Sequence, residues 1–172
     1  MTPYELFAAM SPSLGAEILD WAFTDEKVLY KTTVNEVATL LKARPAFLER
    51  QPRAERNATI TKAISRRAMA TTAGNLLTAW LLKKQTPILI DFLEALKIKH
   101  DKGMVEDLPK SVDDEALKSA LDMLLAKYPN ETVAVYLFAF NYMNSANWAN
   151  LDEHLHTDPR LELGKAKEIS QS

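Results

Sequence analysis

The sequence predicts an all-α protein, a compact bundle or irregular superhelix of about eight helices built from stacked antiparallel helical hairpins. Three observations lead to this prediction. Apolar residues recur at spacings of three and four in most segments. Glycine is scarce, with 4 in 172 residues, and the regular turns that sheets need are missing. Helix ends followed by polar turns recur at unequal offsets, which disfavours a strict solenoid of the tetratricopeptide kind.

Two helix starts stand near the amino terminus. Thr2-Pro3 and Ser11-Pro12 each join a residue that can cap free backbone amides to a proline suited to a first helical turn. We expect a short helix after the first and a longer one after the second. A third helix should run over 28–42, where valines and leucines repeat at helical spacing.

The next segment is divided by proline. Pro45 and Pro52 bracket a single helical turn or connection, and a helix resumes at Arg53. On a helical wheel Arg67 falls on the apolar side beside Ile60. Either the helix breaks near Arg67, which we favour, or a partly buried guanidinium needs an anionic partner.

The stretch 68–96 predicts the central hairpin of the core. Its first arm ends at Lys83-Lys84, and Thr86-Pro87 starts the second, with threonine as the amide cap. A connection this short makes neighbouring helices antiparallel. Gly74 lies in a run of small residues, and we interpret it as the site of a close helix crossing.

The last third holds a loop and three helices. We expect the loop at 98–107, an amphipathic helix from Ser111 to Tyr128, and a short helix over 147–156. The apolar run 133–140 could be a strand or a buried helix, and we choose the helix because a lone strand would have no partner. A single domain is expected over 1–160, with a flexible tail over 161–172.

The composition limits the cellular location and the kinds of site that the chain can have. The chain has no cysteine, which excludes disulfides and thiolate sites, and no apolar run long enough to span a membrane. No basic, apolar leader opens it. We therefore expect a soluble, cytoplasmic protein that does not contact membranes. Charge is uneven, because residues 42–84 hold 10 basic and 2 acidic side chains.

The sequence contains no pattern typical of catalysis. No Gly-rich phosphate loop, serine nucleophile motif or metal-ligand spacing is present, and the three histidines, His100, His154 and His156, follow no known ligand pattern. Asp91 and Glu94 share a helix face, which is typical of solvated carboxylates. We predict no catalytic residue, no metal and no cofactor, which leans away from an enzyme.

Two groups of residues favour binding instead. The first is an amide and aromatic row that could hold a peptide backbone: Asn141, Tyr142, Asn144 and Trp148. It predicts a macromolecular interaction domain with a protein or peptide partner, although capping explains single asparagines equally well. The second predicts the alternative, nucleic-acid or anionic-ligand binding by the basic segment 44–67: Arg53, Arg56, Arg66 and Arg67. These arginines lie on different faces of the predicted helix, and the sequence pI is about 5.9. We therefore favour binding of a protein or peptide over binding of nucleic acid.

Overall fold

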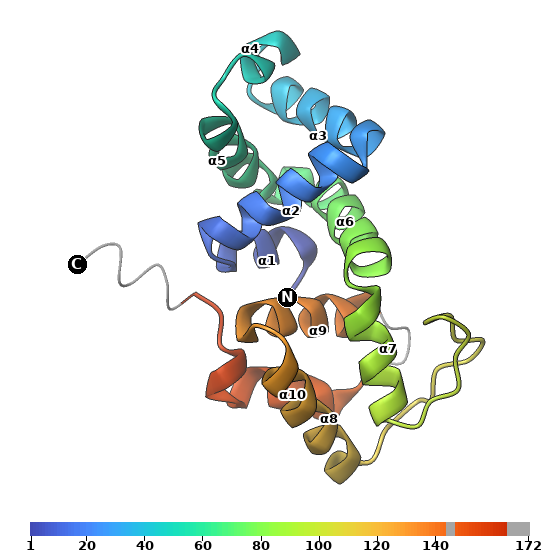
Figure 1. The fold of residues 1–172 in the computed structure, drawn as a ribbon. Helices are drawn as coiled ribbons and strands as arrows, with labels where there is room; N and C mark the ends of the chain where they lie inside the picture. The colour runs from blue at the N-terminus through green and yellow to red at the C-terminus, as the bar shows by residue number, and fades with distance from the viewer. Residues whose placement is uncertain (144–146, 165–172) are drawn as a thin grey trace. The chain divides into compact units, whose positions relative to one another are not determined.

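Helices account for all regular secondary structure in the computed structural model, which describes residues 1–143 and 147–164 (Figure 1). The all-α prediction is confirmed for that part of the chain. The chain divides into two compact units, one covering Met1–Trp80 and one starting at Leu81. The prediction of one domain over 1–160 stays a prediction, and residues 165–172 of the predicted tail lie outside the described residues.

The first unit is a bundle of helices around α5. Its elements are α1 (Pro3–Ala9), α2 (Pro12–Asp25), α3 (Lys27–Leu40), α4 (Pro45–Glu49), α5 (Arg53–Ile64), the 3₁₀ turn η1 (Arg67–Met69) and α6 (Ala70–Ala79). Helix α5 packs on α1, α2 and α3, and α6 packs on α1 and α3. The predicted cap holds at Ser11, whose hydroxyl accepts the Leu14 N–H at 3.2 Å. The break near Arg67 is confirmed, since Arg66 is extended and Arg67 is exposed.

The second unit is built on α9. Its elements are the remainder of the π-helical segment η2 (Trp80–Lys84), α7 (Thr86–Ala95), α8 (Asp114–Lys127), α9 (Asn130–Met143), α10 (Ala149–Thr157) and the 3₁₀ turn η3 (Pro159–Leu161). Every residue from Val133 to Ala139 is buried, so the apolar run is a central helix and not a strand. Helix α8 packs on α7 and α9, and α10 packs on α9.

The predicted hairpin over 68–96 spans the boundary between the two units and stays a prediction. Helix α6 buries its apolar residues against α1, α3 and α5 within the first unit, and α7 packs on α8 within the second. The expected polar turn is helical instead, because η2 continues the backbone in π geometry as far as Lys84. Thr86 also differs from the prediction, since its hydroxyl donates to the Leu82 carbonyl at 2.7 Å and caps no amide.

The close crossing expected at Gly74 lies at another glycine. A Cβ atom added to Gly74 would meet only Pro3 Cγ at 3.8 Å, which is ordinary contact. A Cβ at Gly15 would come within 3.1 Å of Thr61 Cγ2. The close approach therefore belongs to α2 and α5, and it requires the bare backbone of Gly15.

A polar contact joins α7 to α8 within the second unit. The Asp91 carboxylate accepts a hydrogen bond from Lys127 Nζ at 2.7 Å and another from the Tyr128 hydroxyl at 2.6 Å. These donors favour the charged carboxylate and hold the pKa of Asp91 below its ordinary value. Asp91 therefore fixes α7 against α8 and is not the free acid or base of a catalytic pair.

We expect this contact to make unfolding depend on pH. Because the pKa of Asp91 is lower in the folded chain, its contribution is complete above the ordinary aspartate pKa, about 4. That contribution is lost as the pH falls through the lowered folded-state pKa. Asp91→Asn should reduce the free energy of unfolding by about 1–2 kcal/mol at pH 7, since two bonds to a charged acceptor are weakened.

Urea unfolding of both proteins between pH 2.5 and pH 7 measures this effect. The gap between wild type and Asp91→Asn should narrow towards the acid end. Asp107→Asn is the control, because Asp107 is an exposed aspartate of the loop between α7 and α8. A gap that stays constant with pH would contradict the assignment.

Candidate functional site

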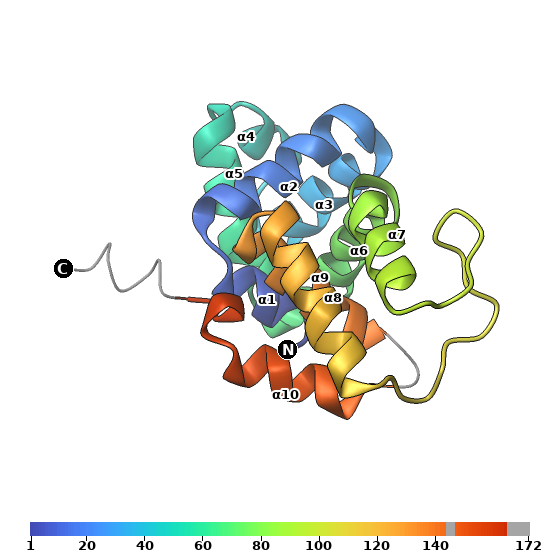
Figure 2. The same ribbon diagram turned by 60° about the horizontal axis from the view of Figure 1, so that its bottom comes forward.

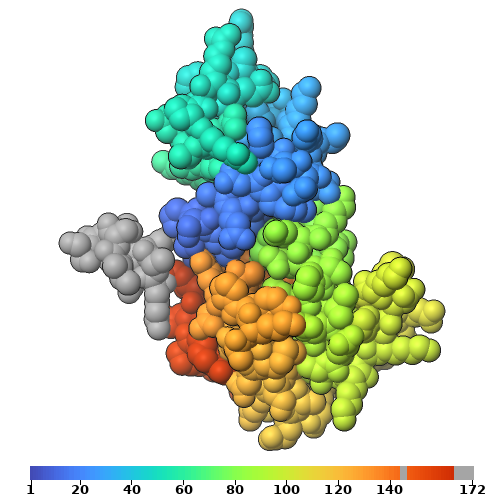
Figure 3. Space-filling view, viewed as in Figure 1, coloured from blue at the N-terminus to red at the C-terminus, as the bar shows by residue number. Residues whose placement is uncertain are grey.

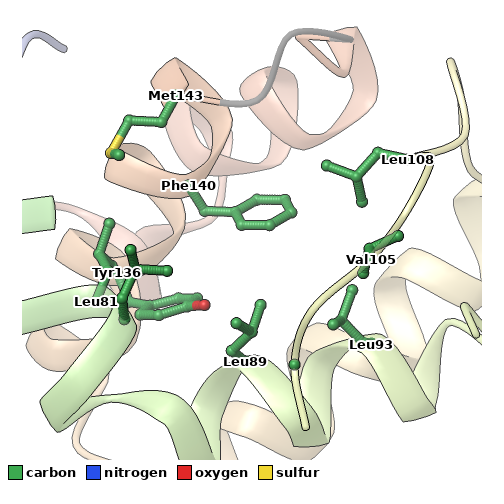
Figure 4. Close-up of a pocket in the computed structure, with 10 residues that line it drawn as sticks. Leu81, Leu89, Leu93, Val105, Leu108, Tyr136, Phe140 and Met143 are labelled. Atoms are coloured by element: carbon green, nitrogen blue, oxygen red, sulfur yellow. The ribbon is translucent and has the colours of Figure 1, made fainter. Parts of the chain in front are cut away.

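The second unit contains a half-open apolar cavity of about 220 Å³ (Figure 4). Ten residues from four segments of the chain line it: Leu81, Leu82, Leu89, Leu93, Gly103, Val105, Leu108, Tyr136, Phe140 and Met143. None of them carries a charged side chain. In the close-up their side chains converge from the helices on one side and from the loop on the other. We refer to these ten residues as the apolar pocket.

Helical periodicity places one wall of the apolar pocket. Tyr136, Phe140 and Met143 are spaced at i, i+4 and i+7 along α9, which puts them on one face of that helix. Leu89 and Leu93 have the same i, i+4 relation on α7. The π-helical segment adds Leu81 and Leu82, and such segments are frequent at functional sites.

The opposite wall is the loop between α7 and α8, which Figures 1, 2 and 3 show standing out beside α7. A tight turn shapes this loop, because Asp101 and Met104 exchange backbone hydrogen bonds of 2.8 and 2.9 Å. Gly103 has a φ of +87°, and a Cβ there would lie 3.0 Å from Leu89 Cδ2. Glycine thus supplies both the turn and the room for the loop to lie against α7.

A histidine fastens the same turn. His100 Nδ1 accepts the Gly103 N–H at 3.0 Å, and its Nε2 lies 3.5 Å from a Glu94 carboxylate oxygen. Accepting at Nδ1 requires that nitrogen to be unprotonated. These two contacts of His100 hold the loop wall in place.

One polar group points into the apolar pocket. Tyr136 is 1% exposed, and the described residues give its hydroxyl no hydrogen-bond partner. Figure 4 shows the hydroxyl oxygen directed towards Leu89. Burial disfavours the phenolate and raises the pKa of Tyr136 well above its ordinary value. The hydroxyl is therefore a neutral group that can donate or accept one hydrogen bond.

The rim of the apolar pocket exposes large apolar side chains. Leu82 is 60% exposed and Met143 is 45% exposed, and Tyr142 beside them on α9 is 56% exposed. The walls contain no nucleophile, acid or base apart from the neutral Tyr136. This arrangement can bind an apolar group and exclude water from it, but it supplies no residue for bond-breaking chemistry.

No family model, curated protein or solved structure matches this chain.

Two members of the predicted amide and aromatic row are inside the structure. Asn141 is 3% exposed and Trp148 is 1% exposed. Asn141 Oδ1 accepts the Trp148 N–H at 3.0 Å, its Nδ2 donates to the Trp148 carbonyl at 3.3 Å, and the indole N–H donates to the Pro109 carbonyl at 2.8 Å. Their polar atoms are occupied by internal bonds, so neither side chain is accessible to a partner here. Asn144 lies outside the described residues.

These buried residues nevertheless support the apolar pocket. The Trp148 ring packs against Phe140, with 5.5 Å between ring centroids, and Phe140 in turn lines the cavity. Tyr142 is the one residue of the predicted row that the described structure places at the surface. The peptide-binding prediction for this region therefore needs different contact residues, namely those of the pocket and its rim.

The predicted arginines divide into two groups. Arg53 Nε donates to Asp20 at 2.7 Å, and its guanidinium lies 4.5 Å from the Phe23 ring centroid. Arg56 donates to the Glu49 carbonyl at 3.3 Å and lies over the same ring. Both are engaged within the first unit, although Arg53 is exposed, as are Arg66 and Arg67. Anion binding by these four arginines stays a prediction.

Two further observations concern metals and membranes. Among the described residues, no three histidine, aspartate or glutamate side chains gather closely enough to hold a metal ion. His154 instead lies 2.8 Å from Asp114, joining α10 to α8. Within the same part of the chain, no helix has the length and apolarity that a membrane crossing requires.

Sequence reasoning did not find the pocket residues of α9. Tyr136, Phe140 and Met143 lie in or beside a continuous apolar run, where no polar face shows which side is left uncovered. The sequence does not mark Leu82 and Gly103 as pocket residues either, because exposed leucines and loop glycines are common in proteins. The one available signal was the glycine in a loop without helical periodicity, which marks a special backbone position but not its purpose.

Proposed function

We propose that this chain binds a protein partner by accepting a large, mainly apolar side chain of that partner into the apolar pocket. The observation that carries the proposal is the open cavity with apolar walls, beside the exposed side chains of Leu82 and Met143. Protein interfaces concentrate their affinity in a few apolar anchors that fill such pockets, surrounded by contacts that exclude water. The region is the one in which the sequence predicts a peptide-binding surface.

Size supports a side chain over a free metabolite. The cavity of about 220 Å³ is smaller than the roughly 300–1,000 Å³ of sites that enclose small molecules. It is larger than a cavity of about 150 Å³, which holds one benzene molecule. A single large side chain fits this range, and the exposed rim then adds contact area around it.

The proposal predicts that one charge at the rim abolishes partner binding. Leu82→Glu places a carboxylate beside the apolar walls, where an incoming apolar side chain would have to desolvate it. We expect partner affinity to fall at least tenfold, while the free energy of unfolding changes by no more than about 0.5 kcal/mol. Val28→Glu is the matched control, because Val28 is a large apolar residue of α3 that is 83% exposed.

The measurement has two stages. Wild type, Leu82→Glu and Val28→Glu are immobilised and exposed to native extract, and the retained proteins are compared by quantitative mass spectrometry. A protein retained by wild type and Val28→Glu but lost with Leu82→Glu is then purified, and its affinity for all three is measured. Identical retention by wild type and Leu82→Glu would refute the proposal.

The chain has no cysteine and is compatible with a reducing compartment, and we propose the cytoplasm as the place of this interaction. Fractionation of the native cell, with antibodies against the chain, tests that placement. Recovery of the chain from an oxidising compartment would contradict it.

A second candidate function, binding of nucleic acid or another anion, rests on the first unit. A hollow at α4 is lined by Arg44, Arg50 and Phe47, and Phe47 is 61% exposed. Exposed aromatic rings between arginines can stack bases while the cations contact phosphates. Within the basic segment 44–67, this hollow is a better candidate for anion binding than Arg53 and Arg56, whose guanidinium groups are engaged within the first unit.

Removing both cations should weaken nucleic-acid binding and its salt dependence. For the double variant Arg44→Ala/Arg50→Ala we expect about tenfold lower affinity for labelled single-stranded RNA, with a salt slope smaller by about 2. Lys31→Ala/Lys62→Ala changes the net charge equally and is the control. Fluorescence anisotropy across a salt series gives both quantities. Equal affinities of wild type and both variants would exclude the α4 hollow as a nucleic-acid site.

A further inference from the structure

The hydroxyl of Tyr136 identifies the kind of side chain that the apolar pocket accepts. Resting on the proposed function, we infer that the partner inserts an aromatic side chain with a neutral hydrogen-bonding tip, a tyrosine or a tryptophan. A leucine or phenylalanine fills the same space without satisfying Tyr136. Three properties of the pocket lead to this inference.

The first property is the unpaired hydroxyl. Tyr136 is 1% exposed, its oxygen lies in the wall of the cavity, and the described residues offer it no partner. In the open pocket water can reach the hydroxyl, but an inserted side chain displaces that water. A purely apolar occupant then leaves a buried polar group unsatisfied, whereas a phenol O–H or an indole N–H can donate to it.

The second property is the shape and character of the walls. The rings of Tyr136 and Phe140 are stacked, with 6.4 Å between centroids and 16° between planes, and both line the cavity. Aromatic rings gain additional attraction from other rings beyond the area they bury. A volume of about 220 Å³ also suits one ring with a substituent, since about 150 Å³ accommodates benzene alone.

The third property is the lack of compensation for charge. None of the ten lining residues is charged, so an inserted ammonium, guanidinium or carboxylate would lose its hydration without gaining an ion pair. This excludes the long charged side chains, whose stems would otherwise fit the apolar walls. Tyrosine and tryptophan remain as the aromatic side chains that have a polar tip and stay neutral throughout the physiological pH range, in which histidine takes up a charge.

The test measures how the affinity changes when the hydroxyl is removed from the ligand and when it is removed from Tyr136. N-acetyl-tyrosine amide and N-acetyl-phenylalanine amide are titrated into the full chain, and NMR shifts of the Leu89 and Leu93 methyl groups give the affinities. Tyr136→Phe, which keeps the ring and removes only the oxygen, is titrated in parallel. Circular dichroism confirms that the variant is folded.

We expect wild type to prefer the tyrosine amide over the phenylalanine amide by about tenfold, and Tyr136→Phe to show a ratio near one. N-acetyl-tryptophan amide should behave like the tyrosine amide, and N-acetyl-leucine amide like the phenylalanine amide. Whichever of the two polar-tipped amides binds more tightly identifies the anchor.

Two results would overturn the inference. If the tyrosine and phenylalanine amides bind wild type equally, the polar tip is irrelevant, although the apolar pocket still accepts side chains and the proposed function stands. If none of the four amides shifts the pocket methyl groups, the anchor assignment fails. The proposed function fails separately, if the partner retained by wild type is also retained by Leu82→Glu.

Discussion

Replacement of Trp148 by alanine should lower the free energy of unfolding by roughly 3–5 kcal/mol, the usual cost of removing a fully buried tryptophan side chain. The indole is 1% exposed and packs against Phe92 and Phe140, with centroid separations of 6.3 and 5.5 Å. Its N–H also donates to the Pro109 carbonyl at 2.8 Å. Alanine would remove the ring contacts and leave a cavity among residues of α7 and α9.

The same substitution should also increase the mobility of the apolar pocket, because the indole packs against Phe140, which lines the cavity. Binding of the aromatic amides should weaken in Trp148→Ala even though Trp148 does not line the cavity. Trp148→Phe keeps one aromatic ring but loses the bond to Pro109 and one ring of the indole, so it shows how much of the loss a smaller ring restores. We expect it to cost about 1–2 kcal/mol.

Urea unfolding followed by circular dichroism at 222 nm measures all three proteins without relying on tryptophan fluorescence. Tyr142→Ala is the control for a neighbouring aromatic that is 56% exposed, and it should change stability by no more than about 0.5 kcal/mol. Stability of Trp148→Ala within 1 kcal/mol of wild type would show that the indole is not a core element.

Local sequence signals predicted the helices well because each depends on neighbours a few residues away. Ser11 caps α2 through the Leu14 amide, and proline begins α4 and α7 as expected. The Asp113 side chain caps α8 by accepting the Ala116 N–H at 3.0 Å, close to the helix start predicted at Ser111. Such short-range hydrogen bonds and fixed φ angles are set by the local sequence alone.

Long-range pairing could not be predicted in the same way. The Lys83-Thr86 segment has the composition of a turn, yet its backbone is helical through Lys84. Which helices pack together depends on which apolar faces fit one another within the folded chain. A single sequence does not carry that information, because the apolar faces of α1, α5 and α8, built from leucine, isoleucine, phenylalanine and alanine, are chemically alike.

The candidate site illustrates a related limit. An asparagine and a tryptophan near a helix end have the composition of a binding surface and of a buried polar contact alike. Only burial distinguishes the two roles, and here it assigns Asn141 and Trp148 to the interior. The accessible surface nearby is made instead by Leu82, Tyr142 and Met143, whose sequence context is unremarkable for a helix.

Asn141→Ala provides the sharpest distinction between those two roles. The amide pairs with both backbone groups of Trp148, the residue that precedes α10. Without it the Trp148 N–H would be buried and unpaired, while the Trp148 carbonyl would keep its bond from the Asp152 N–H at 3.1 Å. Together with the small cavity, we expect a loss of about 2–3 kcal/mol in the free energy of unfolding.

Asn141→Leu divides this loss, because leucine fills the space but cannot pair with the N–H. A destabilisation close to that of alanine would show that the hydrogen bond dominates, since the apolar volume is then restored. The decisive comparison is with partner binding. If Asn141→Leu keeps the stability of wild type and yet loses the partner that wild type retains, the amide contacts the partner directly and its internal role is wrong. If stability falls and the remaining folded fraction binds normally, Asn141 positions α10 behind the apolar pocket, as its two bonds to Trp148 indicate.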